Sequence, residues 1–275
     1  MQIHIQKIGN LELIVIQTQE QRIAPALELF PMATLELLEV ARDAQPEFFG
    51  ASGSELLFTQ NICAIRSSDA IILIDTGLPL ENGTSPLLEG LKSVGIAPED
   101  VATVFLTHRD MDHVGGTLTL EGEAVYPNAR HIMARTEYTD FAKDQTRAEL
   151  FEKRFAPLVR KNLLEIVGND ASIAPGISLV FTPGHRSGAT SVLLESEGQK
   201  ALLLADVMHA PVQVSHPNWS IKFDQNPELA AKTRASILER AERENLLLAV
   251  PHAPFPGLGN VARDAKGTAI WQNAV

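Results

Sequence analysis

The segment THRDMDHVGG, residues 107–116, follows directly on the apolar run VATVFL, residues 101–106. It holds two histidines and two aspartates within six positions: His108, Asp110, Asp112 and His113. The uninterrupted apolar run predicts a strand that is buried on both faces. Because functional side chains concentrate on loops that a rigid scaffold positions, a strand that leads at once into such a loop indicates an active site.

The spacing of these side chains allows two geometries. In an extended segment His108, Asp110 and Asp112 point to the same side, and His113 approaches from the loop beyond. A helix would instead pair His108 with Asp112. The alternative without function is a solvated turn, which commonly holds aspartates but rarely paired histidines. The segment alone therefore favours metal binding.

Three further ionisable residues also follow predicted strands. His185 lies in TPGHRSGAT between glycines, which would let the backbone pass close to a ligand. Asp206 ends the strand LLLADV, where its burial would be costly without a cation or hydrogen-bond donors. His252 closes the last apolar strand, LLLAVPH. Each residue alone has an ordinary structural explanation, but imidazoles and carboxylates at several strand ends predict a divalent metal site.

The same residues resemble the signature of a known family. THRDMDHVGG is similar to the H-x-H-x-D-H motif of the metallo-β-lactamase superfamily, with Asp110 in place of the second histidine. TPGH, Asp206 and His252 follow in the order that this family shows. The resemblance covers residues 55–265 and is closest to the methyl parathion hydrolase and lactonase-like branch.

This resemblance implies an α/β fold (α+β by some schemes), an αββα sandwich with the site at one edge. It implies two divalent metal ions per chain. Zinc is the metal most expected, and manganese and iron are alternatives because of Asp110. His108, Asp110 and His185 would hold one ion. The other ion would be held by Asp112, His113 and His252. Asp206 would bridge the two, and a metal-bridging hydroxide would cleave a lactone, carboxylic ester or organophosphate ester.

The departure at Asp110 has two interpretations. A third aspartate lowers the positive charge of the centre, so that bound water is activated less and harder metals than zinc are favoured. Alternatively, Asp110 binds metal poorly and leaves a one-metal site or an inactive scaffold. We favour the first, because the other six positions fit the signature.

Other residues are predicted to support the site. Asp112 would also orient the attacking hydroxide, and His209 would face the pocket as a catalytic group that contacts substrate or transfers protons. Asp75 would accept the outer N–H of a ligand histidine, although a simple turn residue is nearly as good an explanation. An apolar wall of the pocket is a weaker hypothesis, since such residues more often serve plain packing: His216, Trp219 and Phe223.

The chain of 275 residues is predicted to form a single domain, with residues 1–50 as a less certain arm. Residues 61–77 predict a hairpin, Ser85 and Pro86 open a helix that Gly95 ends, and Asn226 opens a second helix. The only cysteine, Cys63, lies in an apolar strand and is predicted to be structural.

Composition limits the partners. The formal net charge of −11 disfavours nucleic acid and anionic membrane surfaces. No apolar stretch approaches the roughly 20 residues of a membrane span, so we expect a soluble, cytoplasmic protein acting on small molecules. A homodimer is possible, with residues 1–50 roofing the partner's site.

Competing functions use the same residues differently. A thioester or β-lactam hydrolase would differ only in pocket shape, and a persulfide-oxidising enzyme would need iron. A further hypothesis is a binding protein that kept the fold but lost catalytic turnover. Asp110 is the only residue that supports it.

Overall fold

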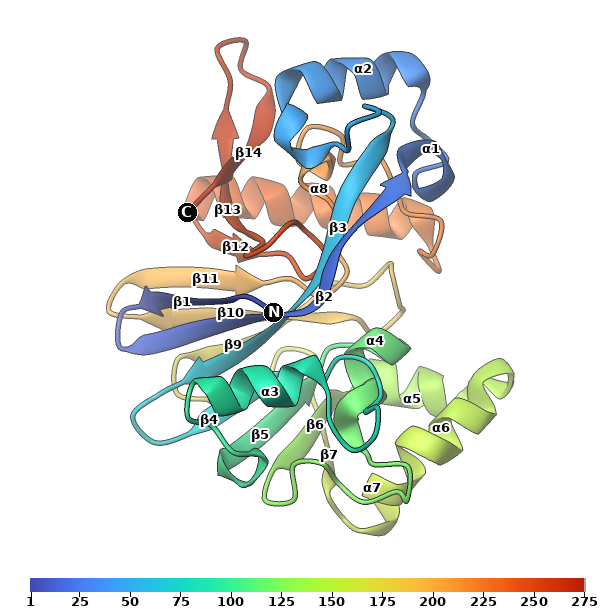
Figure 1. The fold of residues 1–275 in the computed structure, drawn as a ribbon, viewed down its shortest axis with the longest axis vertical. Helices are drawn as coiled ribbons and strands as arrows, with labels where there is room; N and C mark the ends of the chain where they lie inside the picture. The colour runs from blue at the N-terminus through green and yellow to red at the C-terminus, as the bar shows by residue number, and fades with distance from the viewer. Residues whose placement is uncertain (275) are drawn as a thin grey trace.

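The computed structural model describes residues 1–274, which form two seven-stranded sheets packed face to face (Figure 1). The first sheet runs in chain order through β1 (Ile3–Ile8), β2 (Leu11–Pro25), β3 (Glu55–Arg66), β4 (Ile71–Ile74), β5 (Val101–Leu106), β6 (Arg130–Ala134) and β7 (Leu164–Val167). The second sheet contains β8 (Ser172–Ala174), β9 (Ile177–Phe181), β10 (Thr190–Ser196), β11 (Gln199–Leu203), β12 (Leu247–Ala249), β13 (Leu258–Arg263) and β14 (Ala269–Asn273). Each half of the chain thus builds one sheet.

The helices lie outside the two sheets. On the first sheet's side are α3 (Pro86–Ser93), α4 (Met111–Val114), α5 (Arg135–Lys143), α6 (Ala148–Arg154) and α7 (Ala156–Arg160). On the opposite side are α1 (Ala26–Leu29), α2 (Leu35–Ala44) and α8 (Pro227–Glu244) (Figure 1). The predicted αββα sandwich is therefore confirmed. Among residues 1–274, none of the helices has the length and apolar character that crossing a bilayer requires.

Alternating side chains on the strands build the apolar layers. On β2, Leu13 and Val15 pack between the sheets, whereas Ile14 and Ile16 pack on the side of α3, where they meet Leu91. Successive residues of a strand point to opposite faces, so that one apolar run fills two layers. A third layer lies between the second sheet and α8.

The predicted local elements are largely present. The β3–β4 hairpin pairs Cys63 with Ile74 in antiparallel register. The Ser85 side chain caps α3 by accepting from Leu88 N over 3.3 Å, and Asn226 caps α8 in the same way at Leu229 N over 3.1 Å. Side-chain oxygens satisfy backbone N–H groups that a helix start leaves unpaired.

The first 50 residues are more ordered than the sequence indicated. β1 and β2 form the edge of the first sheet, and the long β2–β3 hairpin extends past it toward α8 (Figure 1). There Phe48 and Leu56 join the third apolar layer. This segment therefore lies over its own chain beside the sheet edge, and it contributes to the pocket described below. The β13–β14 hairpin was not predicted.

The sheet edge that carries the site is set by strand ends. β5 leads to His108, β9 to His185, β11 to Asp206 and β12 to His252. The two packed sheets thereby bring residues far apart in the sequence to one edge.

Candidate metal centre

Asp206 lies between two pairs of histidines. Its Oδ2 lies 3.7 Å from His108 Nε2 and 3.4 Å from His185 Nε2. Its Oδ1 lies 3.2 Å from His113 Nε2 and 3.3 Å from His252 Nε2. The two carboxylate oxygens therefore face two separate imidazole pairs.

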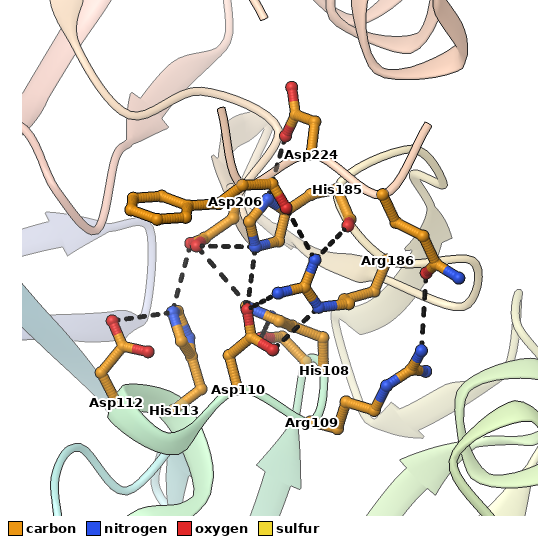
Figure 2. A network of polar contacts seen from close by, with 12 residues as sticks. His108, Arg109, Asp110, Asp112, His113, His185, Arg186, Asp206 and Asp224 are labelled. Carbon is orange, nitrogen blue, oxygen red and sulfur yellow. Dashed lines mark hydrogen bonds and ion pairs between the residues drawn. The ribbon is translucent and has the colours of Figure 1, made fainter. Parts of the chain in front are cut away.

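The other two aspartates of the motif extend these pairs. Asp110 Oδ2 lies 3.1 Å from His185 Nε2 and 3.7 Å from His108 Nε2. Asp112 Oδ2 lies 3.7 Å from His252 Nε2, on the opposite side of the cluster. All seven residues predicted as metal ligands thus meet at one place (Figure 2 shows six of them).

The donor set fits divalent metal ions. His108, His185 and Asp206 offer ligand atoms within 4.8 Å of one another, as do Asp112, His113 and His252. Among the seven candidate ligands, three buried side-chain atoms make no hydrogen bond within residues 1–274: His108 Nε2, His113 Nε2 and Asp206 Oδ1. Buried polar atoms rarely stay unpaired, and imidazole nitrogens with carboxylate oxygens are ligands of zinc and similar ions. The residues present therefore support divalent metal binding.

The outer nitrogens of the histidines are held by other groups. His113 Nδ1 donates to Asp75 Oδ2 over 2.7 Å, and His185 Nδ1 donates to Asp224 Oδ1 over 2.9 Å. Asp75 also accepts from Thr107 N, and it has a positive φ of 65°, which turns the chain tightly after β4. His252 Nδ1 donates to a backbone oxygen over 3.2 Å. Such contacts fix the ring orientation and aim Nε2 at the centre. The sequence predicted Asp75 and missed Asp224.

Two arginines donate hydrogen bonds to Asp110, and these contacts were not predicted from the sequence. Arg186 Nε donates to Asp110 Oδ1 over 2.8 Å, and Arg147 Nη1 donates to the same oxygen over 2.9 Å (Figure 2 shows Arg186). The positive charges of the two guanidinium groups offset the negative charge of the Asp110 carboxylate. The expectation that Asp110 lowers the net charge of the site therefore loses its basis. The one sequence signal for this contact is that Arg186 directly follows the candidate ligand His185.

Charge coupling shifts the pKa values inside the cluster. Burial alone would lower the pKa of His185, but Asp206 and Asp110 raise it to about 9. The pKa of His113 is likewise raised by Asp206 and Asp112 against the effect of burial. Burial would raise the pKa of Asp206, yet the surrounding histidines hold it well below its usual range. Carboxylates that stay ionised in a buried site attract cations.

The two glycines around His185 allow close packing against neighbouring helices. A Cβ on Gly184, whose φ is +140°, would lie 2.4 Å from the Ala230 backbone of α8. A Cβ on Gly188 would lie 2.1 Å from Glu137 N in α5. These glycines therefore let two helices approach the His185 loop, which positions the imidazole through packing.

A cavity of about 540 Å³ opens onto the cluster. His209 lines it, with Nε2 at 3.1 Å from Asp206 Oδ2 and its ring stacked on His252. Phe223 also lines it, whereas Trp219 is fully buried in the apolar layer under α8. Further apolar walls come from both halves of the chain: Ile23, Ala24, Leu29, Phe58, Met111 and Ile221.

Cys63 has no part in this site. It lies in the apolar layer between the sheets, and burial, together with Asp75, raises its pKa to about 12. A thiol with so high a pKa is a poor nucleophile.

Comparison with known proteins agrees with this geometry. The family model described as "Metallo-beta-lactamase superfamily" matches residues 57–252. The chain belongs to the metallo-β-lactamase superfamily, which confirms the resemblance found in the sequence. The named relatives and structural neighbours are lactonases or hydrolases, and the enzyme class is that of a hydrolase.

The relatives include two bacterial lactonases. The N-acyl homoserine lactonase AiiA of Bacillus thuringiensis subsp. kurstaki is 27% identical over 212 residues, covering 68% of this chain and 78% of that protein. AiiB of Agrobacterium fabrum, another N-acyl homoserine lactonase, is 28% identical over 165 residues, covering 51% and 59%.

Two solved structures share the whole fold. AidC, described as a dizinc quorum-quenching lactonase, superposes with a TM-score of 0.85 at 22% identity, over 99% of this chain and 97% of AidC. The hydrolase AbOPH superposes with a TM-score of 0.88 at 22% identity and the same coverage. At this identity the likeness establishes the fold.

Proposed function

We propose that this chain is a lactonase with a dinuclear zinc centre. The observation that carries the proposal is the position of Asp206, whose Oδ1 and Oδ2 each face a different pair of histidines. A carboxylate placed in this way can bridge two ions. His108, Asp110 and His185 would hold one ion, and Asp112, His113 and His252 the other.

Bound divalent ions would supply an activated water as nucleophile and would polarise the scissile carbonyl. The protein side chains would orient the metal ligands and the water. Asp75 and Asp224 hold the rings of His113 and His185 in place, so that no reorganisation is needed when substrate enters. Asp112 would orient the water through its second oxygen, and its half-buried side chain borders the cavity.

The cavity supports a substrate with an apolar tail. Its apolar walls lie beside the predicted ligands, and Phe223 and Ile23 are more than half exposed at its opening. An acyl chain would bury these surfaces while the lactone ring reaches the centre. The relatives named as N-acyl homoserine lactonases favour this substrate class over thioesters and β-lactams.

Elemental analysis of the purified full chain, with turnover assays, tests the proposal. We expect about two zinc ions per chain, and hydrolysis of acylated lactones that a chelator abolishes and added zinc restores. Aryl esters and phosphotriesters serve as comparison substrates. Asp206→Asn is expected to lose both metal and activity. Metal-free, inert wild-type protein would leave only a binding role.

Two further expectations stay predictions. A single domain and a homodimer each require solution measurement, and sedimentation of the wild-type chain would decide the second.

A further inference from the structure

Arginine donors occupy most of the hydrogen-bonding capacity of Asp110. Arg186 donates from Nε to Oδ1 and from Nη2 to Oδ2, so that the guanidinium grips both carboxylate oxygens (Figure 2). Arg147 donates to Oδ1 as well. Two parallel bonds from one guanidinium fix a carboxylate in orientation as well as in charge.

A count of lone pairs shows what remains for a metal ion. A carboxylate has about four acceptor sites, two on each oxygen. Arg186 and Arg147 use both sites of Oδ1, and Arg186 uses one site of Oδ2. The last site on Oδ2 faces His185 Nε2 at 3.1 Å and His108 Nε2 at 3.7 Å. Asp110 thus offers one acceptor position to the centre, as an imidazole nitrogen would.

Arg186 is itself held in place. Its Nη1 donates to the backbone oxygens of His185 over 2.7 Å and of Phe223 over 2.9 Å. Only 8% of its surface is exposed, so solvent screens its charge little. It would still point at position 110 if another residue stood there.

We infer that Asp110 and Arg186 form one metal-ligand unit without net negative charge, at the position where the superfamily signature has histidine. Arg186 is the positioning residue, and it presents a single Oδ2 acceptor site to the ion. This inference rests on the proposed metal centre. It explains how an additional aspartate fits the signature without adding net negative charge.

The inference predicts that restoring histidine alone fails. Asp110→His would place an imidazole against the fixed guanidinium, whose charge would then repel the neighbouring ion. Removing that charge in Asp110→His/Arg186→Gln would recover the site. A matched control is Asp110→His/Arg22→Gln, because Arg22 lines the same cavity and its side chain forms no hydrogen bond or ion pair within residues 1–274.

The experiment measures zinc per chain by elemental analysis after dialysis of each full-length variant against the same chelator concentration. We expect about two ions in wild type, about one in Asp110→His, a return toward two in the Arg186 double variant, and no return in the Arg22 double variant. Asp110→Asn, with and without Arg186→Gln, repeats the series with an isosteric side chain. Circular dichroism confirms that each variant is folded.

Several outcomes would overturn the inference. One is an Asp110→His variant that keeps two ions by itself, and another is an Arg22 double variant that recovers metal as well as the Arg186 one. A folded Arg186 double variant with no recovery in either series would also contradict it. Wild-type protein without metal would remove the proposed function and the inference together, whereas normal wild-type loading with uncoupled variants would remove the inference alone.

Discussion

Asp75 is a single side chain that connects the first sheet to the candidate metal centre. It accepts from Thr107 N and from Thr107 Oγ1, each over 2.8 Å, while it orients His113. Asp75→Asn keeps the shape but weakens its pull on the Nδ1 proton. We expect zinc affinity to fall roughly 10- to 100-fold, measured by competition with a chelator of known affinity.

The control for this variant is Asp69→Asn, an exposed residue of the β3–β4 turn. It should leave the zinc affinity unchanged. Equal affinities for Asp75→Asn and wild type would show that Asp75 shapes the turn only.

His209 is expected to act on the reaction without holding metal. Burial lowers its pKa and keeps it neutral, with one ring nitrogen near Asp206. We predict that His209→Gln keeps its zinc and loses about 100-fold or more in kcat on a lactone, in the range of a lost acid or base catalyst. In contrast, His252→Gln should lose zinc. If His209→Gln also loses zinc, His209 is a ligand.

At the scale of elements, β6 contains a buried histidine, His131, that is not part of the candidate site. His131 is fully buried on the same strand face as Met133, and burial lowers its pKa to about 4. Between pH 6.5 and 4 the unfolded chain therefore binds more protons at this residue than the folded chain does. The contribution of His131 to the free energy of unfolding therefore falls as the pH falls through this window.

His131→Leu removes this contribution. Relative to wild type, the variant should gain up to about 1.4 kcal/mol in free energy of unfolding for each pH unit from 6.5 down to about 4. Urea unfolding of metal-free protein at several pH values measures the difference. Parallel stability curves for the two proteins would rule out the predicted titration.

The elements also show what the sequence could and could not predict. Capped helices and apolar strands are local patterns, so α3, α8 and the β3–β4 hairpin were predicted from neighbouring residues. The seven metal-site candidates were found because each follows a strand end. Arg186, Arg147 and Asp224 act through partners 37 to 76 residues away, and no local pattern identifies such pairs.

β2 shows a second limit of sequence reading. Its fifteen residues include the polar run Gln17–Arg22, which breaks the apolar pattern of a buried strand. The structure continues pairing through register shifts at this run, as a bulged strand does. Long-range pairing with β3 therefore determines this part of the fold.

At the scale of the whole molecule, the layer between the sheets joins both halves of the chain. It contains Val15 and Phe105 from the first sheet and Val192 and Leu203 from the second. We expect metal-free protein to unfold in one transition. Fluorescence of Trp219 and Trp271, both in the second half, should change together with far-UV circular dichroism, which reports on both halves. Two separate midpoints would show independent units.

The four residues 168–171 connect the two sheets, and they divide the proposed ligands into two sets. His108, Asp110, Asp112 and His113 precede them, and the other three follow. A chain cut at this connection would yield two fragments, neither with a complete binding site. Zinc would bind ligands from both fragments at once. Tight zinc binding by the mixed fragments would therefore show that the two halves had reassembled. In the intact chain, the same division predicts that the proposed metal site would be complete only after both sheets have packed together.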